Sequence, residues 1–229
     1  MNCELLMIGS ELLLGRVVDT NATYLAGRLA DIGMNLHYKT SVGDNPQRIV
    51  AALNLAIERS DVVITSGGLG PTEDDITREA VAQTIGAELG FRQELLADIE
   101  AKFASRGLKM TPNNKRQAFL PEGAMVLQNR SGTAPAFAVE FGGCTIISLP
   151  GVPAELKQIT ETEVLPYLFK RHIPGGAVIM SRELKLSAVA ESAVDEKVGD
   201  LVRTSRNPTV GILAQSGVIM IRITAKAKD

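Results

Sequence analysis

The chain is organised around a strand, a glycine-rich loop and an acidic cluster that run Val62-Val63-Ile64-Thr65-Ser66-Gly67-Gly68-Leu69-Gly70-Pro71-Thr72-Glu73-Asp74-Asp75-Ile76-Thr77. The stretch begins with three consecutive β-branched apolar residues, which is typical of a buried strand in a parallel sheet. It leads into residues 78–85, which we predict to be a helix. Between the two, the glycines allow positive φ angles and let a ligand approach bare backbone amides.

The order of glycines and carboxylates indicates a site for a phosphorylated ligand. Backbone amides at the start of a helix attract anions, whereas Glu73, Asp74 and Asp75 would repel the same anion. A hard divalent cation such as Mg²⁺ removes this conflict when it lies between carboxylate and phosphate. The alternative interpretation is structural: the glycines shape a tight turn, and Asp74 or Asp75 caps the next helix. The loop matches neither a Walker motif nor Gly-x-Gly-x-x-Gly.

The composition describes a globular chain of 229 residues, enough for one large domain or one domain with a small companion. The net charge of −2 and the pI near 5.8 give no general attraction to nucleic acid or anionic membranes. Cys3 and Cys144 lie in apolar runs and are expected to be buried small hydrophobes. No signal peptide and no apolar run approaching ~20 residues is found. We therefore expect a cytoplasmic protein without membrane contact.

The first part of the chain alternates strands and helices. We expect strands at residues 3–8, 36–42 and 62–64, and helices at residues 22–32, 47–59 and 78–85. This order predicts an α/β fold with a parallel sheet, helices on both faces and right-handed crossovers.

The second part changes pattern twice. We expect helices at residues 91–106, 113–118 and 154–167, a strand at 125–128, and a hairpin of strands 137–140 and 145–149. After a linker at 171–176 come a strand at 177–186, a helix at 188–202 and a hairpin of strands 209–213 and 218–224, which turns at Gln215-Ser216-Gly217. We therefore predict two domains, residues 1–171 and 177–229. The second is a βαββ unit too small for a large core of its own.

Three glycine-containing loops follow strands and are expected to meet at one rim of the sheet. They are residues 9–15, which include Glu11, residues 67–70, and Gly151. Asp19 and Asn21 precede a helix, where they serve equally well as helix caps or as ligand contacts. Lys115 and Arg116 would screen a phosphate or stay solvated, and their position favours solvation.

Six motifs follow one another along nearly the whole chain: Ile8-Gly9-Ser10-Glu11-Leu12-Leu13 with Gly15; Asp19-Thr20-Asn21; residues 65–77; Asn114-Lys115-Arg116-Gln117-Ala118; Asn129 with Gly132-Thr133-Ala134-Pro135; and Pro150-Gly151-Val152-Pro153-Ala154-Glu155. Together they resemble the CinA family of competence- and damage-inducible proteins. Six motifs in order are far more specific than one glycine loop. One departure is Ala136, where the family usually has glycine, and we expect it to narrow the loop's approach to ligand.

The resemblance implies a doubly wound three-layer α/β sandwich of the molybdopterin-binding fold, followed by a small KH-like α+β unit. It implies divalent-metal-dependent hydrolysis of ADP-ribose to AMP and ribose 5-phosphate. It also places Asp75 where related molybdopterin adenylyltransferases keep a carboxylate for Mg²⁺ and nucleotide chemistry. Full-length bacterial members often continue into a nicotinamide-nucleotide amidase domain. We therefore expect a truncated form or a short member, without amidase activity.

The first hypothesis is an ADP-ribose pyrophosphatase that uses Mg²⁺, Mn²⁺ or Co²⁺. Its catalytic residues would be Asp75, Asp74 and Glu11, with Glu11 or Glu155 orienting water, and its metal ligands would be Asp75, Asp74 and Asp19. The resemblance and the loops together assign substrate binding to Gly9, Asp19, Asn21, Ser66, Gly67, Gly68, Gly70, Lys115, Arg116, Gly132, Thr133, Pro150, Gly151 and Glu155.

The second hypothesis is a binding module that holds a pterin or nucleotide without turnover. A possibility between these two hypotheses is adenylyl transfer to molybdopterin, since the same loop serves both hydrolysis and adenylyl transfer. Nucleic acid is not an expected partner, because the C-terminal unit lacks a Gly-x-x-Gly loop between two helices and the chain is not basic. Family precedent favours a homodimer.

Overall fold

The computed structural model describes residues 1–172, 177–215 and 217–228. They form two compact units, the larger of Met1–Ala30 with Met34–Leu168, and the smaller of Asp31–Gly33 with Phe169–Asp229. The predicted domain boundary, at residues 171–177, lies a few residues after this division. The predicted linker residues 173–176 and the turn residue Ser216 lie outside the described residues.

Six strands form the main sheet of the larger unit, in the order β2-β1-β3-β8-β7-β6. They are β1 (Asn2–Ile8), β2 (Asn35–Val42), β3 (Val62–Ser66), β6 (Met125–Leu127), β7 (Ala136–Phe141) and β8 (Cys144–Leu149). The strands β2, β1, β3 and β8 run parallel, and β7 is antiparallel to both of its neighbours. The predicted parallel order and the β7–β8 hairpin are therefore confirmed. Because β2 and β3 lie on opposite sides of β1, the sheet has a topological switch point there.

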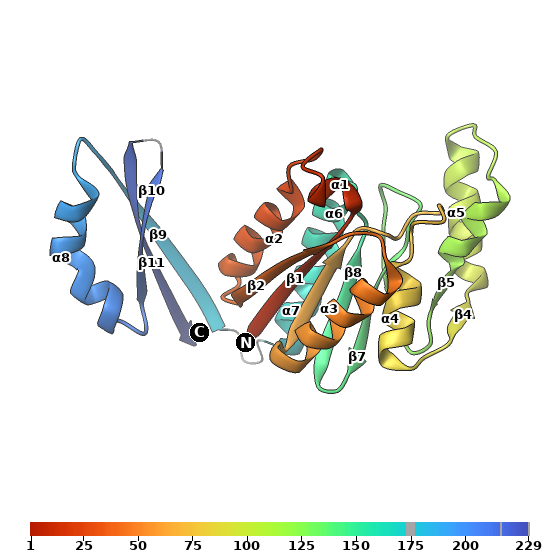
Figure 1. Cartoon of the computed structure of the whole chain (residues 1–229), viewed down its shortest axis with the longest axis horizontal. Helices are drawn as coiled ribbons and strands as arrows, with labels where there is room; N and C mark the ends of the chain where they lie inside the picture. The colour runs from red at the N-terminus through yellow and green to blue at the C-terminus, as the bar shows by residue number, and fades with distance from the viewer. Residues whose placement is uncertain (173–176, 216, 229) are drawn as a thin grey trace. The chain divides into compact units, whose positions relative to one another are not determined.

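Helices cover both faces of this sheet, which gives a three-layer α/β sandwich (Figure 1). In Figure 1, α3 (Pro46–Arg59) and α4 (Thr77–Ile85) lie in front of the sheet, with α6 (Pro153–Ile159) and α7 (Leu165–His172) behind it. The remaining helices of this unit are α1 (Ser10–Leu13), α2 (Thr20–Asp31) and α5 (Gln93–Ser105).

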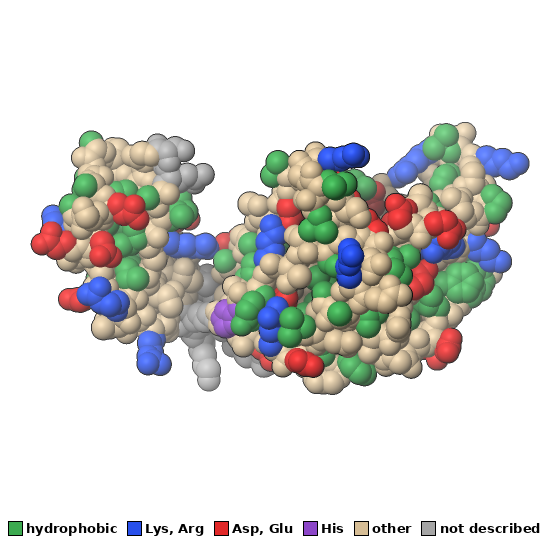
Figure 2. Space-filling model, in the orientation of Figure 1, with side chains coloured by type: hydrophobic (Ala, Val, Ile, Leu, Met, Phe, Trp, Pro, Cys, Tyr) green, Lys and Arg blue, Asp and Glu red, His purple; other side chains and the backbone are tan. Residues whose placement is uncertain are grey.

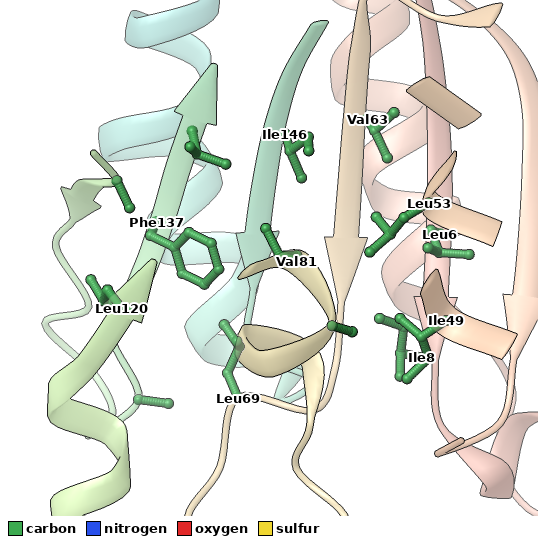
Figure 3. Packing of buried hydrophobic residues seen from close by; sticks show 14 of the residues in the cluster. Leu6, Ile8, Ile49, Leu53, Val63, Leu69, Val81, Leu120, Phe137 and Ile146 are labelled. Atoms are coloured by element: carbon green, nitrogen blue, oxygen red, sulfur yellow. The ribbon is translucent and has the colours of Figure 1, made fainter. Parts of the chain in front are cut away.

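The core on the α3–α4 face is built from alternate residues of the strands. Leu6 and Ile8 of β1 point to this face and pack near Ile49 and Leu53 of α3 (Figure 3). Phe137 of β7 is fully buried in the same cluster. Burying each such side chain contributes about 1.5–3 kcal/mol. Every second side chain of β1, and every third or fourth side chain of α3, points to the same face. This spacing determines which side chains meet between the sheet and the helix.

The predicted helix at residues 91–106 begins too early. Leu89–Phe91 is a short strand, β4, which pairs antiparallel with β5 (Phe119–Pro121). The Phe91 and Phe119 rings lie 5.3 Å apart between centroids. This cross-strand contact holds Phe91 in an extended conformation, so α5 starts only at Gln93. The predicted short helix at residues 113–118 is a 3₁₀ helix, Pro112–Ala118.

The predicted helix at residues 154–167 is interrupted. A π-helical turn, Thr160–Val164, separates α6 from α7. Pro166 explains the interruption, because proline inside a regular α-helix clashes with the carbonyl four residues earlier and lacks the amide to bond it. A wider turn is one way in which a helix accommodates this.

The smaller unit is the predicted βαββ arrangement. Its elements are β9 (Ala177–Ser187), α8 (Glu191–Thr204), β10 (Thr209–Gln215) and β11 (Val218–Lys228), and its antiparallel sheet has the order β10-β11-β9. Its small core contains Val194, Ile219 and Ile221. The helix starts later than predicted, because Ala188 has a positive φ of 59°, which an α-helix cannot contain.

Surface charge is mixed on the face of the larger unit drawn in Figure 2, where basic and acidic side chains are interspersed. Among the described residues, no helix is both long and apolar enough to cross a membrane.

Candidate functional site

A cavity of about 380 Å³ opens at the carboxyl ends of the parallel strands β1, β3 and β8. Ligands of open α/β sheets bind at this place, beside the switch point. All three predicted glycine loops contribute, and 11 of the predicted residues line the cavity: Gly9, Glu11, Gly67, Gly68, Gly70, Asp74, Asp75, Thr133, Pro150, Gly151 and Glu155. The structure thus brings the three loops to one rim.

Two glycines of the central loop are required by the backbone. Gly67 has a φ of 107°, and a Cβ there would lie 2.0 Å from the Ile8 carbonyl oxygen. Gly68 has a φ of 67°, and a Cβ there would lie 2.2 Å from the Thr77 hydroxyl. That hydroxyl donates to the Gly67 carbonyl at 2.7 Å. Any other residue would push the loop away from β1 or from α4.

Buried side chains fix this loop from beneath. Leu69 is buried in the core near Val81 (Figure 3). Arg78 is fully buried and donates to the carbonyls of Leu69, at 2.6 Å, and of Gly70, at 2.9 Å. Burial lowers the pKa of Arg78, but an arginine stays protonated in proteins. The apolar Leu69 side chain and the cationic Arg78 side chain therefore hold the loop in place.

The same arrangement leaves amides available to a ligand. The loop carbonyls are taken by Arg78, by the Thr77 hydroxyl and by Gln117, whose Nε2 lies 3.4 Å from the Leu69 oxygen. Within the described part of the chain, the amides of Gly68, Leu69 and Gly70 meet no hydrogen-bond acceptor. Adjacent free amides in a fixed loop favour an anion such as phosphate.

Carboxylates stand beside these amides in a fixed position. Asp75 accepts hydrogen bonds from the Thr72 amide at 2.9 Å and from the Thr72 hydroxyl. The Thr72 side chain and a backbone amide also hold the pKa of the exposed Asp74 below its usual value. A Cβ on Gly70 would lie 2.4 Å from the Asp75 carboxylate, so the glycine makes room for it. This end of the cavity therefore offers hard oxygen ligands.

Three further carboxylates line the cavity. Glu11 follows β1, and a Cβ on Gly9 would lie 2.5 Å from its carboxylate. Asp44 follows β2 and accepts from the Ser10 amide at 2.8 Å. Glu155 accepts from Asn129 Nδ2 at 2.7 Å. The cavity combines free amides on one loop with carboxylates from several others, which is the donor set for a metal-bound polyphosphate.

A smaller cavity of about 100 Å³ adjoins the first and shares Ile8, Glu11 and Gly151 with it. Three predicted residues line only this one: Asp19, Asn21 and Ser66. Asp19 caps α2, since its Oδ1 accepts from the Ala22 amide at 2.9 Å and its Oδ2 pairs with Lys39 Nζ at 2.8 Å. Asp19 therefore lies apart from the cavity that Asp74 and Asp75 line.

Residues 4–170 match the family model described as "Probable molybdopterin binding domain", and residues 181–229 match the model described as "Damage-inducible protein CinA KH domain". The chain belongs to the CinA family. A "CinA-like protein" from Dictyoglomus turgidum is 45% identical over 229 residues, and a competence-damage inducible protein from Caldicellulosiruptor saccharolyticus is 44% identical over 229 residues. Each alignment covers 100% of this chain and 55% of the relative, so the chain spans about half the length of these curated relatives.

Solved structures agree with this assignment to the CinA family. The crystal structure of CinA from Thermoplasma acidophilum has a TM-score of 0.67 and 36% identity, and covers 72% of this chain and 96% of that chain. The molybdopterin biosynthesis enzyme MoaB from Thermus thermophilus has a TM-score of 0.50 and 23% identity, and covers 73% of this chain and 91% of that chain. The MoaB likeness shows the fold alone.

Four residues singled out from the CinA motifs lie outside both cavities. Lys115 is exposed, with its Nζ 5.2 Å from the centre of the Phe91 ring. Arg116 donates to the Thr72 carbonyl at 2.9 Å, so it braces the acidic segment. Gly132 packs against Glu155. Ala136 is buried at the start of β7, so the expectation that it narrows the approach to ligand is wrong.

The predicted metal set of Asp75, Asp74 and Asp19 stays a prediction. No cluster of three or more His, Cys, Asp or Glu side chains suited to a metal is found among the residues that the structure describes. Asp74 and Asp75 line one cavity and Asp19 the other, with Glu11 common to both.

Two important residues were missed, and each left a signal. Arg78 shares a helical face with Val81, Ala82 and Ile85, a spacing that places it on the buried side of α4. Asp44 follows a parallel strand that ends at the same edge as β1. Asp44 is also adjacent to the start of α3, but Asn45 is the residue that caps this helix, by accepting from the Arg48 amide at 3.0 Å.

Proposed function

We propose that this chain is a divalent-metal-dependent ADP-ribose pyrophosphatase that releases AMP and ribose 5-phosphate. One observation carries the proposal: the free amides of Gly68, Leu69 and Gly70 and the carboxylates of Asp74 and Asp75 line a single cavity. Amides alone would suit any anion. Carboxylates beside them favour a ligand whose charge is bridged by a cation, such as a diphosphate.

The residues fit Mg²⁺, Mn²⁺ or Co²⁺. Asp74 and Asp75 would hold the ion, and Glu11 and Asp44 line the same cavity. Asp19, predicted as a ligand, would act only at the neighbouring cavity. Such a cation supplies charge neutralisation of the diphosphate and polarises phosphorus toward attack by water.

The chain's own groups would bind and orient the reactants. The amides of Gly68, Leu69 and Gly70 would donate to phosphate oxygens without reorganisation, because Arg78 and Leu69 already fix the loop. Glu11, which lines the same cavity, would orient the attacking water. Glu155 is less free to do so, because Asn129 already donates to its carboxylate. Water adds to one phosphorus, the bridging P–O bond breaks, and the other phosphate leaves.

The test is product analysis after incubation with ADP-ribose and each metal, with EDTA as the control. We expect metal-dependent release of AMP that Asp75→Asn abolishes. Asparagine keeps an oxygen that accepts from Thr72, so the fold should persist. Glu73→Gln is the matched control, since Glu73 is a neighbouring carboxylate outside the cavity. Unchanged turnover in Asp75→Asn would contradict the assignment.

A second candidate is a binding module for a pterin or nucleotide. It is favoured by the match to a probable molybdopterin binding domain. Binding without product, with every metal, would support it, whereas AMP incorporation into molybdopterin would indicate adenylyl transfer. The homodimer stays a prediction, which sedimentation would test.

A further inference from the structure

The acidic segment, residues 72–75, is a turn that local hydrogen bonds close. The Thr72 carbonyl accepts from the Asp75 amide at 3.2 Å. In return, the Thr72 amide donates to Asp75 Oδ2 at 2.9 Å, and the Thr72 hydroxyl donates to the same oxygen. These bonds fix the Asp75 carboxylate relative to Thr72, and Asp74 lies beside it in the same turn.

Arg116 ties the acidic segment to the rest of the larger unit. Thr72, Glu73 and Asp74 are exposed, so the segment gains little from packing. Arg116 Nη1 donates to the Thr72 carbonyl at 2.9 Å and lies 3.2 Å from Glu73 Oε1. Among the residues that the structure describes, the segment makes no other hydrogen bond or ion pair to a group outside it. A closed turn with so few outside contacts can move as a body, so this tie determines where its carboxylates lie.

Arg116 is itself held on a fixed support. It belongs to the 3₁₀ helix Pro112–Ala118, in which the next residue, Gln117, is 1% exposed and Ala118 is fully buried. On the other side, Arg116 Nη2 donates to Glu79 Oε1 of α4 at 3.2 Å. The guanidinium is planar and carries its donors in fixed directions, so one side chain bridges a carbonyl and a carboxylate on different elements.

We propose that Arg116 is a positioning residue, which sets the acidic segment at the correct distance from the glycine loop for one metal ion to reach both carboxylates and phosphate. Helix α4 carries Glu79, which holds Arg116, and Arg78, which holds the glycine loop. Arg116 lines neither cavity, so it acts through Thr72 and not on the ligand. The proposal deepens the proposed function and rests on it for the presence of the metal ion.

Two other roles for Arg116 lead to different expectations. A positive charge that only screens phosphate could be replaced by lysine. A residue that only stabilises the fold would change stability without changing the metal affinity of the folded protein. A positioning role uses both Nη atoms at once, so lysine, with its single ammonium group, should not replace Arg116.

The first test is Mn²⁺ titration, followed by electron paramagnetic resonance without substrate, of wild type, Arg116→Met and Arg116→Lys. We expect both variants to bind Mn²⁺ about tenfold more weakly, which is typical when a group that orients a metal ligand is lost. Arg92→Met is the matched control and should bind Mn²⁺ as wild type does. The Arg92 side chain is 31% exposed against 28% for Arg116, donates to the Ala124 carbonyl at 3.1 Å and pairs with Glu94, away from the acidic segment.

The second test follows the acidic segment itself and needs no metal. Nitrogen-15 relaxation in EDTA gives the order parameters of the backbone amides of residues 72–75. We expect values near 0.85 in wild type and Arg92→Met, as in rigid backbone, and a fall toward about 0.6 in Arg116→Met and Arg116→Lys. The two arginine variants should remain folded, because the contacts they lose are partly exposed.

The outcomes separate this proposal from the pyrophosphatase activity. Wild-type Mn²⁺ affinity in Arg116→Lys, an equal loss in Arg92→Met, unchanged order parameters, or no Mn²⁺ binding by wild type would overturn the positioning role. Weaker Mn²⁺ binding and a mobile acidic segment in both Arg116 variants, with no AMP release from ADP-ribose by wild type, would leave the positioning role standing and remove the hydrolase. Metal-dependent AMP release by wild type, with equal Mn²⁺ affinity in all four proteins, would do the reverse.

Discussion

Two loops at the same edge of the sheet are held in different ways. The anchored loop, residues 67–70, has Leu69 only 1% exposed and its carbonyls bound by Arg78, Thr77 and Gln117. The rim loop, residues 9–18, leaves Leu14 66% exposed and Val18 82% exposed. Both contain glycine and both follow a parallel strand, so the sequence pattern alone does not distinguish them.

The difference suggests that the anchored loop and the rim loop have separate roles. A group of fixed shape, such as phosphate, is best met by amides that need no rearrangement, and the anchored loop provides them. The apolar side chains of the rim loop have little to stabilise them except a ligand or partner with an apolar face. Stability and phosphate binding should therefore be sensitive to the anchored loop, and specificity to the rim loop.

The largest contrast is expected between two alanine substitutions at glycine. Gly67→Ala places a Cβ 2.0 Å from a backbone oxygen of β1 and should cost at least about 4 kcal/mol of unfolding free energy. Gly15→Ala has a φ of 66° but meets nothing within 4 Å, so it should cost about 1 kcal/mol. Urea denaturation of both variants measures the difference, and equal losses would contradict it.

Removing the apolar anchor should have the next largest effect. Leu69→Ala opens a cavity in the core and should cost about 3 kcal/mol. Leu14→Ala, on the rim loop, should change stability by less than about 0.5 kcal/mol. Thermal and urea unfolding provide the comparison. A small loss of unfolding free energy in Leu69→Ala would mean that packing of Leu69 in the core does not hold the loop in place.

Arg78→Met should be less damaging to stability than to binding. It leaves the Leu69 and Gly70 carbonyls without donors but removes a buried charge, so a net loss of about 2 kcal/mol is expected. Pyrophosphate affinity should fall, since the amides lose their orientation. Arg116→Met, which breaks only partly exposed contacts, should cost less than about 1 kcal/mol and lower the affinity less than Arg78→Met does. Equal pyrophosphate affinity of Arg78→Met and wild type would show that Arg78 does not orient the loop amides.

The smallest expected effect concerns the ionisation of Asp74. Its pKa is depressed in the folded chain, so the associated stability is present above the ordinary pKa and is lost as pH falls through the lowered value. Thr72→Val removes the first cause of the shift and should move this pKa back toward 3.8. An NMR titration of the carboxyl carbon in EDTA measures it, with Thr84→Val as a control. No change in Thr72→Val would show that another group sets the pKa.

The sequence predicted what depends on local pattern. The run 62–64 and its alternation with amphipathic helices determine parallel strands, and parallel strands bring their following loops to one edge. That is why residues as far apart as Gly9, Gly68 and Gly151 were correctly expected at one rim. Cys3 and Cys144 are free and buried, as apolar runs predicted.

What the sequence did not predict depends on tertiary contacts. The spacing in α4 places Arg78 on the buried face, but the sequence does not show what it binds there, since its partners are backbone carbonyls that carry no sequence signature. The β4–β5 pair joins residues about 30 positions apart, and three-residue strands are too short for a period of two to show. The ion pair between Asp19 and Lys39 of β2 is likewise a contact between distant residues that the sequence does not show.

The most direct test of the central claim is Mn²⁺ binding, followed by electron paramagnetic resonance in the presence of pyrophosphate. The account predicts that wild type and Glu73→Gln bind the ion alike and that Asp75→Asn weakens it at least ~10-fold. Equal Mn²⁺ affinity in all three proteins would contradict the claim that the acidic segment and the anchored loop form one metal–diphosphate site.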